Sequence, residues 1–137
     1  MNKAIVMITG MLLAASAASA FDKTFNLTRE QFENLQISEA GVALNNFSLA
    51  ENDSFMAKGT SKVQVSFSVR NRNQDVRALT VMIVGMSDNE LLWAVDAAPM
   101  MAMVAGNKTE ECNGSAYVPP GTVNQTTAFW IRVVGDF

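Results

Sequence analysis

Residues 62–70, KVQVSFSVR, alternate strictly between polar and apolar side chains. A period of two places Val63, Val65, Phe67 and Val69 on one face of a strand and the polar residues on the other. The run NRNQD that follows, residues 71–75, is rich in residues that tight turns favour. The segment therefore predicts a β-strand with one buried and one solvated face, and hence a sheet packed on a core.

The next segment, VRALTVMIVGM at 76–86, is apolar on both faces, which is typical of a central strand or of one covered by another element. Two more apolar segments follow at 91–97 and 127–135, and we expect both to be strands. Residues 98–114 are loop-like at both ends and apolar in the middle. Short strands separated by Asn, Asp, Gly and Pro turns predict an all-β fold, an antiparallel immunoglobulin-like β-sandwich.

Residues 21–58 contain a pattern that is typical of the start of a helix. Thr28 and Gln31 fit a capping box, and Leu27 with Phe32 fits a hydrophobic staple. We expect a short helix over about 29–35 and extended chain over 37–49, interrupted at Gly41 and at 45–46. We expect this segment to pack on the sandwich core of residues 59–137 and to form one domain with it.

Residues 1–20, MNKAIVMITGMLLAASAASA, have the form of a secretory signal peptide. Lys3 supplies the positive start, an apolar stretch follows, and Ala18-Ser19-Ala20 is a small-residue cleavage site. Cleavage after Ala20 would leave a 117-residue product in the periplasm or outside the cell, in a bacterium. The remaining sequence contains no apolar run of membrane-spanning length, so we expect no integral membrane segment after cleavage.

The order of parts over about 62–134 resembles a bacterial immunoglobulin-like module of the FxLYD type. The resembling parts are VRNRNQDVR, LTVMIVGMSDNELL and the late VPPG…AFWIRVV. At the namesake motif this chain has VGMSD, residues 84–88, which matches the hydrophobic spacing and the Asp but lacks the Phe, Leu and Tyr. The resemblance implies a β-sandwich used as an accessory or interaction domain, without catalytic residues.

Composition excludes most catalytic chemistry. The chain has no histidine and one cysteine, which removes His-dependent triads, His-liganded zinc and all-cysteine metal sites within one chain. Adjacent Glu110 and Glu111 would point to opposite faces of a strand, and Asp88 and Glu90 lie in a turn. We therefore expect no enzyme activity. The net charge of −3 without a basic cluster makes nucleic acid a poor partner.

The second apolar face of 76–86 is the first candidate for function. Met82, Val84 and Met86, together with Trp130, form our candidate interface. Either the N-terminal segment covers this surface, through Phe25, Leu27, Phe32 and Leu35, or the surface binds a partner. We expect coverage by the chain's own N-terminus. The alternatives are self-association or contact with another protein, including a partner strand added at a sheet edge.

The methionines of PMMAMVAG, residues 99–106, are the second candidate. Thioether sulfur suits Cu(I), so Met100, Met101 and Met103, with Cys112 downstream, are candidate copper ligands in an oxidising compartment. The competing interpretation is that methionine fills gaps or contacts a partner. Alternation places Met100 opposite Met101 and Met103, so three sulfurs meet only if the segment bends. Packing is the interpretation we favour, with no cofactor.

Three weaker signals remain in the sequence. A third hypothesis is carbohydrate binding through Trp93 or Trp130. Six N-x-S/T sequons begin at Asn26, Asn46, Asn52, Asn107, Asn113 and Asn124. Cys112 is either an inert, partly buried residue, a free thiol or a bridge between chains, and acidic neighbours would raise its thiol pKa. We expect a secreted, non-enzymatic interaction or assembly component, with a Cu(I)-binding protein as the alternative.

Overall fold

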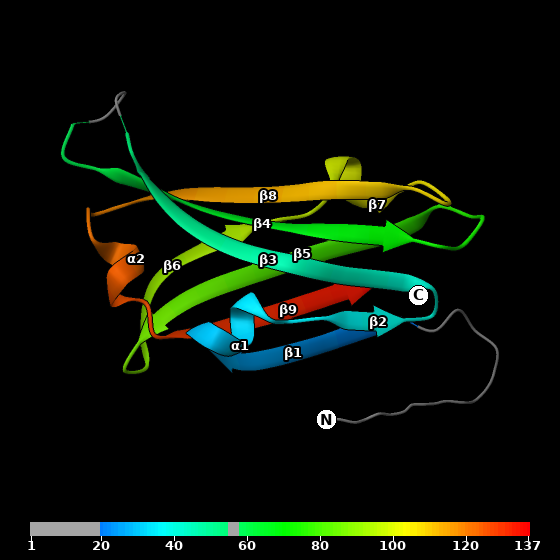
Figure 1. Ribbon diagram of the computed structural model, residues 1–137, viewed down its shortest axis with the longest axis horizontal. Coiled ribbons are helices and arrows are strands. Elements are labelled where there is room, and N and C mark those ends of the chain that lie inside the picture. The colour runs from blue at the N-terminus through cyan, green and yellow to red at the C-terminus, as the bar shows by residue number, and fades with distance from the viewer. Residues whose placement is uncertain (1–19, 55–57) are drawn as a thin grey trace.

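The computed structural model describes residues 20–54 and 58–137. The protein consists of two antiparallel sheets packed face to face (Figure 1). Sheet A has the order β1 (Phe21–Thr28), β9 (Ala128–Gly135), β5 (Arg77–Ser87) and β6 (Glu90–Asp96), and the short β7 (Met103–Val104) also pairs with β5. Sheet B has the order β2 (Ile37–Glu39), β3 (Val42–Asp53), β4 (Ser61–Asn71) and β8 (Thr109–Val118). The antiparallel β-sandwich is thus confirmed. Residues 1–19 of the proposed signal peptide lie outside the described residues.

The N-terminal segment contributes strands to both sheets. β1 pairs along its whole length with β9, from Phe21 opposite Gly135 to Thr28 opposite Ala128. Helix α1 (Arg29–Glu33) then leads to β2 and β3 in the other sheet. The capping box is confirmed, because the Thr28 hydroxyl accepts from the Gln31 amide and the Gln31 side chain accepts from the Thr28 amide. The helix is shorter than expected and ends at Glu33.

The strongest strand signals are confirmed and the weakest one is corrected. β4 and β5 coincide with the alternating segments, and Val63, Val65, Phe67 and Val69 are all fully buried. Residues 109–114, expected to be loop, belong to the ten-residue strand β8. Their alternation was hidden because the inward positions of β8 include Glu110 and Gly114 as well as Cys112, which lies opposite Phe67 on β4.

An aromatic chain links the two sheets through α1. Phe67 stacks on Phe47, both from sheet B, and Phe47 meets Phe32 of α1 edge-on with ring centroids 5.7 Å apart. Phe32 stacks on Phe129 of sheet A at 4.3 Å, and Phe129 meets Trp93. Phe32 has no exposed surface. Helix α1 therefore closes one side of the sandwich by placing a ring between the sheets.

A β-bulge in β3 makes this packing possible. The register with β4 shifts between Asn45 and Ser48, and Asn46 has a positive φ of 59°. The extra residue changes which side chains face inward, so that Leu44 and Phe47, three positions apart, both reach the core. A second short helix, α2 (Thr122–Gln125), follows the Pro119-Pro120-Gly121 turn.

Candidate functional site

The candidate interface residues lie together on the outer face of sheet A. Across β5 and β9, Met82 is opposite Arg132, Val84 is opposite Trp130, and Met86 is opposite Ala128. On the other side of β5, Val84 is opposite Ala94 of β6 and Met86 is opposite Leu91. Because paired residues of neighbouring strands point to the same side of a sheet, these side chains form one surface, which we call the sheet A outer face.

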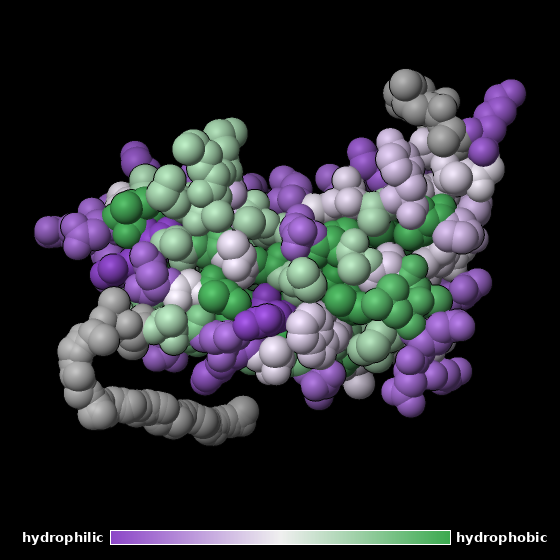
Figure 2. Space-filling model, turned by 180° about the vertical axis from the view of Figure 1, so that it is seen from behind, coloured by the Kyte–Doolittle hydropathy of each residue, from purple (hydrophilic) through white to green (hydrophobic). Residues whose placement is uncertain are grey.

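Apolar side chains on this face are accessible to solvent. Met82 is 43% exposed and Leu91 is 63% exposed, whereas Val84 is buried among its neighbours at 8%. Met86, Trp130 and Val134 are half-buried. Figure 2, which views the molecule from the side of sheet A, shows hydrophobic residues across this face, interrupted by a few hydrophilic residues and bordered by more of them. The alternation of polar and apolar residues did not indicate that Leu91 belongs to this face. Leu91 lies beside the β-bulge at Leu92, where the alternation is lost.

The N-terminal segment does not cover this face, contrary to our expectation. Phe32 lies in the core between the sheets, and Phe25, Leu27 and Leu35 are partly buried against that core. The physical reason is that β1 extends sheet A at the edge of β9, so its apolar side chains share the inner side of the sheet. The described part of the chain therefore leaves Met82 and Leu91 open to solvent.

Charge on the face is nearly balanced. The Arg132 guanidinium donates two hydrogen bonds to the Asp22 carboxylate, Nε to Oδ1 at 3.0 Å and Nη2 to Oδ2 at 2.9 Å. This pairing lowers the pKa of the Asp22 carboxyl and raises the pKa of Arg132. Asp96, opposite Met82 on β6, adds one exposed carboxylate at the margin. The centre of the face, around Val84 and Trp130, is uncharged.

The outer face of sheet B has the opposite character. Its β4 positions are Lys62, Gln64, Ser66, Ser68 and Arg70. The hydroxyls of Ser48 and Ser66 lie 2.6 Å apart across β3 and β4, and Ser68 donates to Glu111 of β8. These groups satisfy one another or face water, and the exposed Tyr117 of β8, opposite Lys62, is a large apolar exception, so most of this face is an ordinary solvated surface. The apolar outer face of sheet A is thus particular to one side of the molecule.

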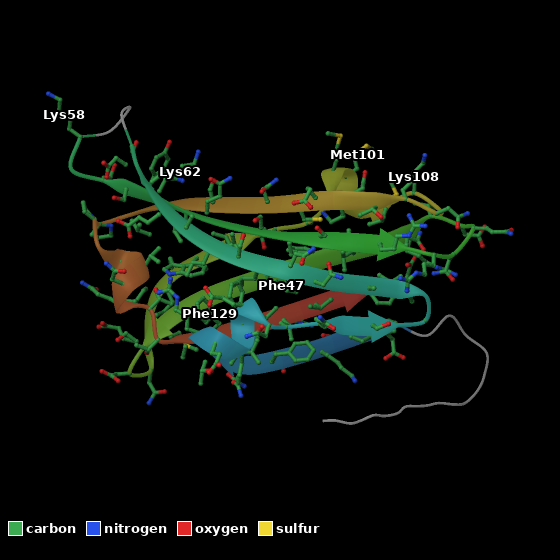
Figure 3. The ribbon with its side chains drawn as sticks, in the orientation of Figure 1. Phe47, Lys58, Lys62, Met101, Lys108 and Phe129 are labelled. Carbon is green, nitrogen blue, oxygen red and sulfur yellow. The ribbon has the colours of Figure 1, made fainter. Side chains whose placement is uncertain are left out.

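The methionine segment forms a projecting turn at the edge of sheet A. The pairing of β6 with β5 continues to Ala97, whose amide donates to Val81, and resumes where Met103 of β7 lies opposite Ala78. Between them the short 3₁₀ helix η1 (Met100–Ala102) projects outward, with positive φ at Met101 and Ala102. Met100 is 84% and Met101 is 78% exposed. Figure 3 shows Met101 at this turn, pointing away from the sheets.

The turn supplies the bend that a site made of three methionines requires, but Cys112 is not beside it on the surface. Cys112 points from β8 into the core and is 1% exposed. Burial, followed by the Glu110 and Glu111 carboxylates, raises the pKa of its thiol to about 12. The candidate copper set is therefore reduced to Met100, Met101 and Met103. Over residues 20–54 and 58–137, His, Cys, Asp and Glu form no group of three that could hold a metal ion.

The remaining sequence candidates are placed as follows. Trp93 is buried, and its ring N–H donates to the Thr126 hydroxyl at 3.0 Å, so it offers no surface for a sugar to stack on. Trp130 is half-buried on the sheet A outer face and retains that possibility. The asparagines of all six sequons are exposed.

No family model matches this chain, and no curated protein or solved structure is significantly similar to it. Among the helices of the described residues, none has the length and apolar character needed to span a membrane. The fold and the two outer faces thus define a class, a small two-sheet β-sandwich with one apolar outer face.

Proposed function

We propose that the protein is a secreted, non-enzymatic interaction component of a bacterial envelope or extracellular structure. Its contact surface is the sheet A outer face, and its partner is a protein surface that is apolar and uncharged at its centre. The observation that carries the proposal is the contrast between the two outer faces of the sandwich. Met82 and Leu91 are exposed on one, while serines and Gln64 occupy the other.

Three further points support this proposal. Residues 1–20 resemble a signal peptide, the sequence lacks histidine, and the pattern over 62–134 resembles FxLYD-type modules, which serve as accessory domains. A monomeric soluble domain seldom exposes a contiguous apolar patch larger than a few hundred Å² unless that patch contacts something. Arg132 and Asp22 neutralise each other, so a partner would not be selected by a strong charge on this face.

Site-specific photo-crosslinking tests the proposal in the exporting cell. A photoreactive residue placed at Met82 is expected to yield a protein adduct, identified by mass spectrometry, and the adduct should disappear in a Leu91→Glu background. The matched control places the same residue at Gln64, on the outer face of sheet B. Absence of adducts at Met82, or equal adducts at both positions, would contradict the proposal.

Copper binding is the second candidate, and the η1 turn is the observation that favours it. Met100 and Met101 are largely exposed and Met103 is partly so, all within four residues at a sharp bend. Thioether sulfur stabilises Cu(I) without histidine. Anaerobic Cu(I) titration against a chromogenic competitor tests this function. Replacing Met100, Met101 and Met103 by leucine should abolish binding, whereas Met82→Leu should not; unchanged affinity in the triple variant rules the site out.

A further inference from the structure

We infer that the sheet A outer face packs against the same face of a second copy of this chain, forming a symmetric face-to-face dimer. This inference rests on the proposed function and names the partner. It is carried by three properties of the face: its balance of charge, the sizes of the side chains in its two central strands, and its area.

Charge balance permits the face to meet itself. Two identical surfaces repel when either carries unpaired charge at its centre, because like charges then face each other. Here Arg132 is neutralised by Asp22 on the neighbouring strand, at 2.9 Å. The unpaired Asp96 lies on the edge strand β6, away from the centre. Nothing in the central pair of strands therefore opposes self-association.

Side-chain sizes in the two central strands are complementary. A two-fold axis parallel to the strands, between β5 and β9, lays β5 of one copy over β9 of the other. The register then brings Trp130 over Val84 of the second copy, and Ala128 over Met86. Each large side chain meets a smaller one, as interdigitating sheet faces require. Arg132 over Met82 completes the row, with the arginine stem lying on the thioether.

The area is sufficient for a reversible dimer. Strands about 4.8 Å apart, with a rise of about 3.4 Å per residue, give the four-strand face a footprint of roughly 19 by 20 Å. Its fourth strand, β1, forms a polar margin, because its outer positions are Asp22, Thr24, Asn26 and Thr28. Side chains make the accessible surface larger than this footprint, so both copies together bury roughly 1,000 Å², near the lower limit of specific interfaces. Met103 of β7 extends the face, because it lies opposite Ala78 of β5. We expect a dissociation constant in the micromolar range.

Sedimentation equilibrium on the purified exported protein, from roughly 1 to 500 µM, tests the inference. The wild type should shift from monomer to dimer over this range, and emission from the half-buried Trp130 should move to shorter wavelength, while buried Trp93 stays constant. Met82→Glu and Leu91→Glu should each raise the dissociation constant at least tenfold. Gln64→Glu, an exposed substitution on the other outer face, should leave it within twofold.

The outcomes separate this inference from the proposed function. A monomer throughout the concentration range overturns the dimer, and the Met82 crosslink to another protein then decides the proposed function independently. A dimer that persists in both glutamate variants also overturns the inference, and it places the contact elsewhere, such as the free edge of β1. Thermal unfolding of each variant verifies that loss of dimer is not loss of fold.

Discussion

Gly85 lies on the inward side of β5, directly against the Trp93 ring. An alanine Cβ built at this position would overlap the indole atoms Cε2, Nε1 and Cζ2. The indole cannot move freely, because its N–H is bonded to Thr126 and its ring packs on Phe129. Glycine is thus required here for close approach of side chain to backbone.

We therefore expect Gly85→Ala to destabilise the fold by about 1–3 kcal/mol, the usual cost of overpacking a core. Denaturant unfolding measures the change. Trp93→Phe replaces the indole by a smaller ring without its Nε1 and Cζ2 atoms, so Gly85→Ala should cost less in that background. An equal cost in both backgrounds would show that the indole is not the cause.

Cys112 is expected to be chemically inert in the folded protein. Its thiol is buried opposite Phe67, and its pKa is raised to about 12, so the reactive thiolate is scarce at pH 8. Iodoacetamide should label it only after denaturation. An introduced Ser115→Cys, on the exposed side of the same strand, should react readily in the native state. Rapid native labelling of the wild type would show that β8 opens or that the thiol is exposed.

Helix α1 stabilises the fold through one ring rather than through its own length, since a five-residue helix does not persist alone. Phe32 contacts Phe47 of sheet B and Phe129 of sheet A. We expect Phe32→Ala to lower the free energy of unfolding by about 3–5 kcal/mol. Phe25→Ala, at a half-buried position of β1, should cost clearly less by the same measurement. Similar losses of unfolding free energy in the two variants would mean that the contacts of Phe32 with both sheets contribute no more than an ordinary half-buried side chain.

The turn before α2 is held by a carboxylate on β3. Glu51 accepts hydrogen bonds from the backbone amides of Gly121 at 2.8 Å and Val123 at 2.9 Å. The amide of Val123, followed by that of Gly121, lowers the pKa of Glu51 below its ordinary value of 4.5. The Pro119-Pro120-Gly121 segment is thereby tied to sheet B.

Because the Glu51 pKa is lower in the folded state, its contribution to stability is present above about pH 4.5 and is lost as the pH falls through the folded-state pKa. Glu51→Gln should lower the melting temperature at pH 7 by several degrees and remove part of this acid dependence. Glu39→Gln, an exposed substitution on β2, is the control. Identical acid profiles for wild type and Glu51→Gln would exclude this role.

At the level of the whole molecule, dimerisation links stability to protein concentration. If two copies associate through the sheet A outer face only when folded, the melting temperature must rise with concentration. We expect this rise in the wild type and in Gln64→Glu, and a clearly smaller rise in Met82→Glu. A wild-type melting temperature independent of concentration between about 5 and 500 µM would contradict the dimer.

Local pattern alone predicted the sandwich, because strict alternation in 62–70 and several short apolar segments separated by turn residues favour strands. It also predicted the capping box at Thr28, since a cap depends on residues three positions apart. It grouped Met82, Val84 and Met86 on one face by the period of two, whereas the pairing of β9 with β5 places Trp130 beside them. These features depend on neighbours in the sequence, and a sequence contains that information directly.

Other features were decided only by tertiary contacts between residues far apart in the chain. The pairing of β1 with β9 sends the N-terminal apolar residues into the core and leaves the sheet A outer face open. The bulge at Asn46 brings Phe47 into the core, and β8 directs Cys112 inward, away from the exposed methionines. A period of two shows which residues share a face, but only the pairing of strands determines whether that face meets the core or water.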